Sequence, residues 1–316
     1  MRIGILGYGN LGRALEIIVR DYADVEVTGV FSRREGVETL GARSYRVEAL
    51  KEMREEIDVL ALCYGSSSDL PNLAPELARQ FNTVDSFDNH GTIEEYKARM
   101  SLASSEGERC SVISLGWDPG LLSLMRLYFS AFLPASSVNT FWGRGISQGH
   151  SEAIRRIDGV RKAVQYTVPK EEALTLASLV RHKLDDVDKH RRVCYICTEK
   201  GKEDRITDEI LSMENYFSGY ETELHFVSEN DPYLETGSMS HRGRIYALGA
   251  SGIYRENKHS LYLNLEIGSN PELTANILLA GAFACHRLYS ESKWGAYTAF
   301  DIPPSYFNIK NVNNYL

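Results

Sequence analysis

Three glycines near the start of the chain constrain its fold more than any other feature. Gly7, Gly9 and Gly12 follow the apolar run RIGIL (2–6) and open a stretch whose positions 11, 14, 15 and 18 form one apolar helical face. In a strand–turn–helix unit the first glycine permits a tight turn, the second lets the backbone approach a pyrophosphate, and the third permits close helix–strand packing. Free N–H groups at the start of the helix favour the phosphates. The motif predicts dinucleotide binding, and the alternative is a tight turn without a ligand.

Short apolar runs alternate with helical patterns through the first 118 residues. The runs that we expect to form strands are 2–6, 25–31, 58–63, 82–87 and 110–115, with a helical stretch near 92–105. Strands that are apolar on both faces and separated by helices indicate a parallel sheet covered on both sides. Residues 1–118 are therefore predicted to form an α/β dinucleotide-binding domain with a Rossmann-type, doubly wound parallel sheet.

A different pattern begins after residue 118. A helix is expected over about 120–132, and later strands, such as 138–143, 220–227, 244–249 and 259–267, alternate in polarity. Such alternation indicates an antiparallel or mixed sheet with one half-solvated face. Residues 119–269 are therefore predicted to form a second domain of α+β type. Its open face carries either helices or a partner subunit, and the pattern favours neither.

The last part of the chain is predicted to return to the first domain. The segment 271–288 has apolar positions at Leu273, Ile277, Ala280, Gly281 and Ala284, which indicates a largely buried helix. We therefore expect residues 270–316 to complete the dinucleotide-binding domain.

The charge balance and the hydropathy bear on partners and location. The chain has 35 Lys and Arg against 43 Asp and Glu, a net charge of −8, which argues against nucleic-acid binding. No run approaches the ~20 apolar residues that span a bilayer. A first strand that starts at Arg2 leaves no room for a signal peptide. We expect a cytoplasmic protein that contacts no membrane.

The cysteines do not indicate disulfides or a metal site. Their number is odd, five, and they are scattered through predicted strands and a helix. Cys194 and Cys197 have a zinc-like spacing, but the run VCYIC (193–197) is expected to be a strand, where positions three apart point to opposite faces. Since no second Cys or His pair lies nearby in the sequence, we interpret the cysteines as structural thiols.

The end of the second predicted strand indicates which cofactor is bound. An NAD enzyme usually has Asp or Glu there, to accept hydrogen bonds from the ribose 2′-hydroxyl. This chain has Ser32, Arg33 and Arg34 instead, a hydroxyl and two guanidinium groups that suit a 2′-phosphate. The sequence favours NADP over NAD, and the alternative is a solvated surface loop.

Hydroxyl and carboxylate groups follow three more strands, where open α/β sheets bind their ligands. Ser66–Ser68 follow the run 58–63 and can meet the cofactor, cap the next helix, or do both. The acidic stretches 85–90 and 116–120 follow the runs 82–87 and 110–115, and Asp88 and Asp118 in them can hold a substrate ammonium group. The alternative for these two stretches is a helix cap and a turn.

Motifs along nearly the whole chain resemble those of meso-diaminopimelate dehydrogenases. The matching segments are GYGNLGR (7–13), FSRR (31–34), DNH (88–90), GWDPG (116–120), TFWG (140–143), SQGHSEAIRRI (147–157), KAVQYT (162–167) and YFSGYE (216–221). The resemblance implies a homodimer whose second domain binds substrate and dimerises. It also implies reversible, NADP-dependent oxidative deamination of the D-centre of meso-2,6-diaminopimelate to L-2-amino-6-oxopimelate, ammonia and NADPH, in the metabolism of lysine and peptidoglycan precursors.

The same resemblance implies site residues in both predicted domains. Cofactor contacts are implied, beside Gly7 and Gly12, at Tyr8, Gly9, Asn10, Leu11, Ser32, Arg33, Arg34, Gly65, Ser66, Ser67, Ser68, Ser86, Phe87, Asp88, Leu115, Gly116, Trp117, Asp118 and Pro119. Substrate contacts are implied at Asp88, Asp118, Trp142, Gln148, Gly149, Thr167, Arg192, His241 and Asn270, with Asp88 and Asp118 as the catalytic pair.

These residue types suit a substrate with two ammonium and two carboxylate groups. Asp88 and Asp118 suit an ammonium group, and Arg192 can bind a carboxylate with two hydrogen bonds. Two alternatives remain: an NADP-dependent oxidoreductase of similar layout that acts on another amino or hydroxy acid, and an NADP-sensing protein without turnover.

Overall fold

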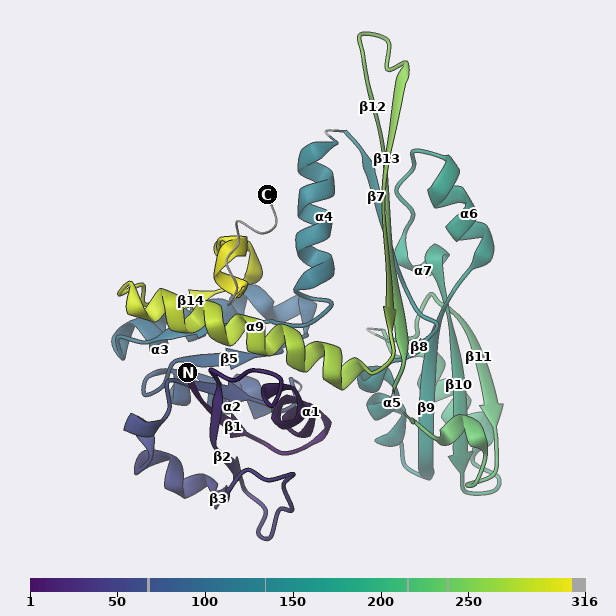
Figure 1. Cartoon of the computed structure of the whole chain (residues 1–316). Helices are drawn as coiled ribbons and strands as arrows, with labels where there is room; N and C mark the ends of the chain where they lie inside the picture. The colour runs from purple at the N-terminus through teal and green to yellow at the C-terminus, as the bar shows by residue number, and fades with distance from the viewer. Residues whose placement is uncertain (67–68, 134, 215, 238, 309–316) are drawn as a thin grey trace. The chain divides into compact units, whose positions relative to one another are not determined.

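The computed structural model describes residues 1–66, 69–133, 135–214, 216–237 and 239–308 (Figure 1). The chain divides into two compact units. Unit 1 comprises Met1–Leu124 together with the segment from Pro271 onward, and unit 2 comprises Met125–Asn270. Unit 1 is therefore built from two separate stretches of sequence, whereas unit 2 is continuous.

Unit 1 contains a seven-stranded sheet in which neighbouring strands pair in parallel, in the order β14-β6-β5-β4-β1-β2-β3. Its strands are β1 (Arg2–Leu6), β2 (Glu26–Ser32), β3 (Ser44–Arg46), β4 (Val59–Leu62), β5 (Thr83–Asp85), β6 (Cys110–Val112) and β14 (Gly295–Tyr297). The chain runs from β1 to one edge and then from β4 to the other, so the topological switch lies between β1 and β4. The predicted doubly wound sheet is confirmed.

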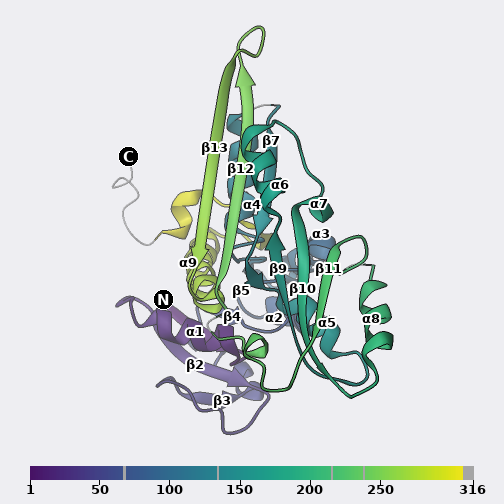
Figure 2. The same cartoon turned by 90° about the vertical axis from the view of Figure 1, so that its right-hand side faces the viewer.

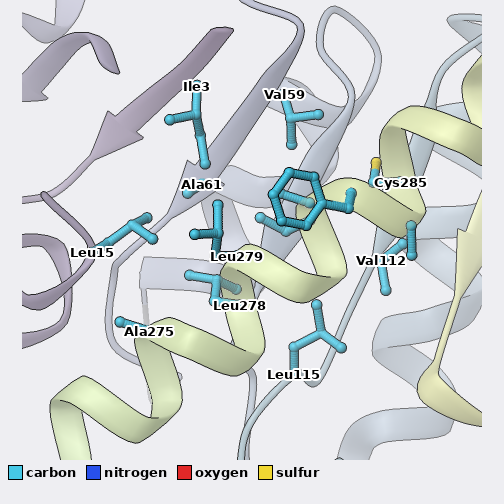
Figure 3. Close-up of a cluster of buried hydrophobic side chains, with 14 of the residues drawn as sticks. Ile3, Leu15, Val59, Ala61, Val112, Leu115, Ala275, Leu278, Leu279 and Cys285 are labelled. Carbon is cyan, nitrogen blue, oxygen red and sulfur yellow. The ribbon is translucent and has the colours of Figure 1, made fainter. Parts of the chain in front are cut away.

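Helices cover both faces of this sheet, which explains why its central strand β4 is apolar and buried at every residue. They are α1 (Asn10–Val19), α2 (Asp69–Ala78), α3 (Ile93–Glu106) and α9 (Asn270–Ser290), with short 3-10 turns η1 (Val47–Lys51), η2 (Arg54–Glu56), η3 (His90–Thr92), η5 (Ala299–Asp301) and η6 (Pro304–Phe307). Ile3 and Ile5 of β1 pack in one cluster with α1 and α9 (Figure 3). Leu6 points to the other face and packs in a second cluster with residues of α2 and α3.

The buried face of α9 differs from the predicted one. Its fully buried positions include 275, 278, 279, 282 and 285 (Figure 3), whereas Leu273, Ile277 and Ala280 are only half-buried. Gly281 and Ala284 are buried as expected. Because the helix is apolar on most of its surface, its periodicity does not identify the face that contacts the sheet.

Unit 2 contains two sheets, whereas the sequence analysis expected one. The helix α4 (Leu121–Phe132) leads into it, followed by a four-stranded mixed sheet, β11-β10-β9-β8, and a three-stranded antiparallel sheet, β13-β12-β7. The strands are β7 (Ser137–Trp142), β8 (Gly145–Ile146), β9 (Val160–Pro169), β10 (His190–Thr198), β11 (Glu221–Phe226), β12 (His241–Ser251) and β13 (Asn257–Ile267). Figure 2 shows β12 and β13 as a long hairpin.

Helices also cover the sheets of unit 2. They are α5 (Gln148–Arg155), α6 (Glu171–Leu179), α7 (Asp186–Lys189), α8 (Glu203–Leu211) and the 3-10 turn η4 (Pro232–Leu234). Cys194 of β10 is buried in a cluster with residues of α5 and α8, and Cys197 is buried as well. In the part of the chain that the structure describes, no helix has the length and hydropathy needed to cross a membrane.

Candidate active site

The glycine turn after β1 leaves backbone exposed where a phosphate would approach. Gly7 has φ +94°, and its N–H donates to the Phe31 carbonyl at 2.9 Å, which ties the turn to β2. A Cβ on Gly12 would lie 2.1 Å from the Gly7 carbonyl oxygen, so only glycine lets the helix pack this closely on the turn. A Cβ on Gly9 would meet nothing within 4 Å, so the space beside the helix N-terminus is open. The three glycines therefore provide the tight turn, the open backbone and the close helix packing that suit a pyrophosphate.

A buried carboxylate that the sequence analysis missed holds this turn against the loop after β2. Glu16 of α1 is almost fully buried and accepts hydrogen bonds from the Tyr8 hydroxyl and from the N–H groups of Leu40 and Ala42. Burial and the Glu16 contact raise the pKa of Tyr8 to about 12, so Tyr8 stays a hydrogen-bond donor at neutral pH. The only signal for this role is an acidic residue in an otherwise apolar turn of the helix.

Three arginines gather at the end of β2, one more than the sequence analysis expected. The Arg34 N–H donates to Ser32 Oγ at 3.0 Å, and its guanidinium donates to the Tyr8 carbonyl at 2.8 Å. Arg46 pairs with Ser32 across β2 and β3 and donates to the Arg33 carbonyl. The sequence could not indicate Arg46, because β3 is too short to be recognised.

Arg33 already holds a carboxylate. It forms two hydrogen bonds with Asp69, of 3.0 and 3.1 Å, and its Cζ lies 4.9 Å from the centre of the Tyr64 ring. Asp69 raises the pKa of Arg33 further above its usual range. The guanidinium is thus presented in the fork geometry that also suits a phosphate.

Ser66 links the loops after β4 and β5. Its Oγ accepts a 3.2 Å hydrogen bond from the N–H of Asp88, and Gly65 accepts one from Leu70 at the start of α2. Ser67 and Ser68, two of the predicted cofactor contacts, lie outside the described residues.

Asp85 is the buried carboxylate of the first acidic stretch. It is fully buried at the end of β5, where Oδ1 accepts the N–H groups of Phe87 and Ser114, both at 3.0 Å. Oδ2 accepts the Tyr96 hydroxyl at 2.7 Å. Burial raises the pKa of Asp85, and the three donors oppose that shift. The side chain therefore joins the loop that carries Asp88 to the loop that carries Asp118.

The candidate catalytic carboxylates stand on those two loops. Asp88 is exposed, and Asp118 is half-buried, with an Oδ1 that accepts the Ser123 hydroxyl at 3.3 Å. The side chains of Phe87 and Leu115 are buried in hydrophobic clusters, so only their backbone is left to contact a cofactor.

In unit 2 two of the predicted substrate residues, Arg192 and Thr167, contact each other at a buried guanidinium. Arg192 of β10 is 9% exposed and faces Thr167 of β9, to whose Oγ1 it donates a 2.8 Å hydrogen bond. Its Nε has no hydrogen-bond partner, and it forms no ion pair with the described residues. Burial lowers the pKa of Arg192. A buried positive charge without a counter-charge is costly, so the arrangement favours an anionic ligand.

Two further polar side chains beside Arg192 were not predicted. Gln165 is fully buried, contacts Thr167 at 3.4 Å, and its Oε1 lacks a hydrogen-bond partner. His150 has a buried Nε2 without a partner, and burial together with the Arg192 charge lowers its pKa to about 3. His150 is therefore neutral at physiological pH, which leaves Arg192 as the cation of this group.

The other predicted substrate residues lie at the ends of the unit 2 strands. A Cβ on Gly145 would lie 2.0 Å from the His241 ring, so glycine there admits the imidazole, whose pKa is lowered by burial. Trp142 ends β7, Gln148 and Gly149 begin α5, and Asn270 begins α9. A Cβ on Gly149 would meet nothing within 4 Å, so its N–H is approachable.

Comparisons with known proteins match nearly the whole chain to diaminopimelate dehydrogenases. Residues 116–269 match the family model described as the diaminopimelic acid dehydrogenase C-terminal domain. A meso-diaminopimelate D-dehydrogenase from Acetivibrio thermocellus is 43% identical, over 99% of this chain and 95% of that protein. The solved structure of a DAP dehydrogenase from Corynebacterium glutamicum in complex with DAP superposes with a TM-score of 0.95 at 36% identity, covering 99% of this chain and 97% of that one. An engineered D-amino acid dehydrogenase bound to NADP+ superposes with a TM-score of 0.91 at 35% identity, covering 99% and 98%.

Proposed function

This chain belongs to the meso-diaminopimelate D-dehydrogenase family, and from that premise we propose which of its residues hold the cofactor and the substrate. Its activity is the reversible, NADP-dependent oxidative deamination of the D-centre of meso-2,6-diaminopimelate, which yields L-2-amino-6-oxopimelate, ammonia and NADPH. The reaction belongs to lysine and peptidoglycan-precursor metabolism.

The residues of unit 1 fit NADP. The open backbone at Gly9 and the helix N-terminus behind it suit the pyrophosphate, and Ser32, Arg33 and Arg34 suit the 2′-phosphate, with Arg46 as an additional cation. The backbone of the loops 65–66, 86–88 and 115–119 supplies the remaining contacts. NADP, when bound, takes up the hydride that leaves the D-carbon of the substrate.

The observation that carries the substrate proposal is Arg192, which is buried and forms no ion pair with the part of the chain that the structure describes. A substrate carboxylate would supply that charge and accept two N–H groups of the guanidinium, with the Thr167 hydroxyl beside it. His241, Asn270, Gln148 and the Gly149 N–H bind the polar groups around this distal end. The Trp142 ring packs on the aliphatic linker.

Asp88 and Asp118 hold the reacting amine at the other end of the substrate. Both carboxylates attract the ammonium form, and an amine must lose a proton before its carbon can be oxidised. Asp118 orients the amine for that step. Water then adds to the imine carbon of the substrate, and ammonia leaves.

We also propose that the protein is a homodimer formed through unit 2. Exposed apolar side chains in this unit include Phe132, Leu179, Ile253 and Tyr254, of which Ile253 at the hairpin tip is 90% exposed. Ile253 and Tyr254 are neighbours in sequence, and a contiguous exposed apolar surface usually marks an interaction site. Sedimentation equilibrium on the purified protein tests this proposal, because a single species of about 36 kDa, the mass of one chain, would contradict it.

A cytoplasmic location is proposed on the state of the cysteines. All five are free thiols, and four of them are buried. Free thiols in such number are typical of a reducing compartment.

The activity is tested by mixing purified protein with NADP and meso-2,6-diaminopimelate and following the NADPH absorbance. Absorbance should rise, and ammonia should form in equal amount. A protein that binds NADP but forms neither product would be a cofactor-binding protein without this activity.

A further inference from the structure

The Arg192 guanidinium rests on an aromatic ring that has no role in the site proposed above. Tyr220 lies at the end of the turn before β11, and the Arg192 Cζ lies 4.1 Å from the centre of its ring. At this distance the ring covers one face of the guanidinium and attracts its charge. The edge of the guanidinium, where its N–H groups point, stays available for hydrogen bonds.

The backbone around Tyr220 fixes the ring in place. The preceding residue, Gly219, has φ +82°, a conformation that favours glycine. The Tyr220 N–H donates to the Phe217 carbonyl at 3.0 Å, and its carbonyl accepts the Thr222 hydroxyl at 3.2 Å. Thr222 in turn pairs with Arg192 across β10 and β11. The ring and the arginine are thus held by the same pair of strands.

Two contacts on Arg192 therefore restrict its side chain. Thr167 accepts one N–H of the guanidinium, and Tyr220 supports the face. An arginine held in this way loses less conformational freedom on binding a carboxylate than a mobile one would. A lysine in its place would keep the charge and lose the stacked plane.

We propose that Tyr220 is a positioning residue, whose ring holds Arg192 in the plane in which it binds the distal carboxylate of the substrate. This inference rests on the substrate role proposed for Arg192. It concerns binding rather than chemistry, because Tyr220 contacts Arg192 and not the reacting carbon.

The test compares KM with kcat in variants at position 220. Tyr220→Leu should raise the KM for meso-diaminopimelate on the order of tenfold, with kcat and the KM for NADP changed less than twofold. Tyr220→Phe keeps the ring and removes the hydroxyl, which also forms a side-chain hydrogen bond with Arg192, so its KM for meso-diaminopimelate should rise less than that of Tyr220→Leu. A matched control is Tyr195→Leu, which removes a tyrosine of β10 that stacks on Tyr233 rather than on Arg192 and should leave all three constants near those of the wild type.

Arg192→Met separates failure of this inference from failure of the proposed function. Arg192→Met should itself raise the KM for diaminopimelate, and adding Tyr220→Leu to it should have no further effect. If Arg192→Met leaves KM unchanged, the proposed role of Arg192 is wrong. If Arg192→Met raises KM but Tyr220→Leu does not, or if Tyr220→Phe is as damaging as Tyr220→Leu, only the inference about Tyr220 fails. Should Tyr220→Leu not fold, Tyr220→Met carries the same expectations.

Discussion

The Tyr96 hydroxyl lies 2.7 Å from Oδ2 of Asp85, and both side chains are buried beneath the loops that carry Asp88 and Asp118. The Tyr96 ring also stacks on Phe87, with ring centres 4.2 Å apart. A single carboxylate thus connects helix α3 with the backbone at the ends of β5 and β6. The two candidate catalytic residues depend on this buried group for their positions.

Asp85→Ala should damage both stability and activity. It leaves two buried N–H groups and one hydroxyl without an acceptor, and each unsatisfied group lowers the free energy of unfolding by about 1–3 kcal/mol. Urea unfolding should show a loss in that range or above, and kcat/KM for diaminopimelate should fall. Tyr96→Phe removes only one of the three donors to Asp85, so it should lower the free energy of unfolding and kcat/KM by less than Asp85→Ala does. Equal stability of Asp85→Ala and the wild type would show that Asp85 does not hold the loops.

Replacing Arg33 and Arg34 together by Ala should weaken NADP binding and leave NAD binding nearly unchanged. Each charge-assisted hydrogen bond contributes roughly 1.5–3 kcal/mol, so the Kd for NADP should rise by about a hundredfold or more. Titration calorimetry with both cofactors measures this. Arg43→Ala removes a charge from an exposed arginine at the far end of the same loop and serves as the control. A wild-type preference for NAD would contradict the assignment of the 2′-phosphate site.

Asp118→Asn keeps the shape of the side chain and removes the charge that attracts the ammonium group. We expect kcat/KM for diaminopimelate to fall by at least tenfold, while the Kd for NADP changes little. The exposed Asp21→Asn, at the far end of α1, is the matched control for loss of one negative charge. Near-normal turnover in Asp118→Asn would remove Asp118 from the site.

Stability should decrease in mild acid because buried histidines remain neutral in the folded state. The pKa of His150 is lowered to about 3 and that of His190 to about 4, mainly by burial. Between those values and about 6.5 the unfolded chain binds protons that the folded chain does not, so stability falls as the pH falls. Each histidine should cost about 2 kcal/mol at pH 5 relative to pH 7.5.

The measurement for this pH effect is the free energy of unfolding at the two pH values. His150→Gln keeps a polar partner for the Ser147 hydroxyl, 2.6 Å from the histidine ring, and should lose less stability at pH 5 than the wild type. An identical loss in both proteins would mean that His150 is protonated in the folded state.

The isomers of diaminopimelate should be distinguished by the charges at both ends of the substrate. The meso isomer has a D-centre to react and an L-centre whose carboxylate meets Arg192. The LL isomer has no D-centre, and the DD isomer misplaces the distal ammonium, so the rates should fall in the order meso, DD, LL. Initial rates on the separated isomers test this, and substantial turnover of the LL isomer would rule out the proposed orientation.

The fold was predictable where the hydrophobic pattern of a segment matches the burial of the strand or helix that it forms. The strand β4 is apolar at every residue, and β1 is apolar at every residue after Arg2, because helices cover both faces of the sheet. The close packing of the turn on the helix admits only glycine at position 12. The strands β3 and β14 were not predicted, because three-residue edge strands carry too little pattern. The division of unit 2 into two sheets was missed because alternation identifies a strand's faces but not its partners.

The candidate site was predictable only where a motif or the family resemblance named its residues. Arg192, Thr167 and Tyr220 meet through strand pairing and a turn, and nothing in their spacing along the chain indicates that meeting. Glu16 and Asp85 are buried carboxylates whose partners are mostly backbone N–H groups, and every residue type except proline offers such a group, so the sequence does not indicate these contacts. The hydrophobic periodicity of a sequence predicts which faces of its helices and strands are buried, but not which polar groups are buried with them.

The two-part construction of unit 1 has a consequence for synthesis on the ribosome. Its N-terminal strands emerge early, yet Leu278, Leu279 and Ala282 of α9, which cover Ile5 and Val112, follow only after all of unit 2 has been translated. At 5–20 residues per second, residues 125–270 take roughly seven to thirty seconds to make. For that time α1 covers only part of this apolar face of the nascent sheet, while unit 2, being continuous, can fold as soon as it leaves the exit tunnel. A cell that makes this protein must therefore keep a half-finished sheet from aggregating in every round of translation.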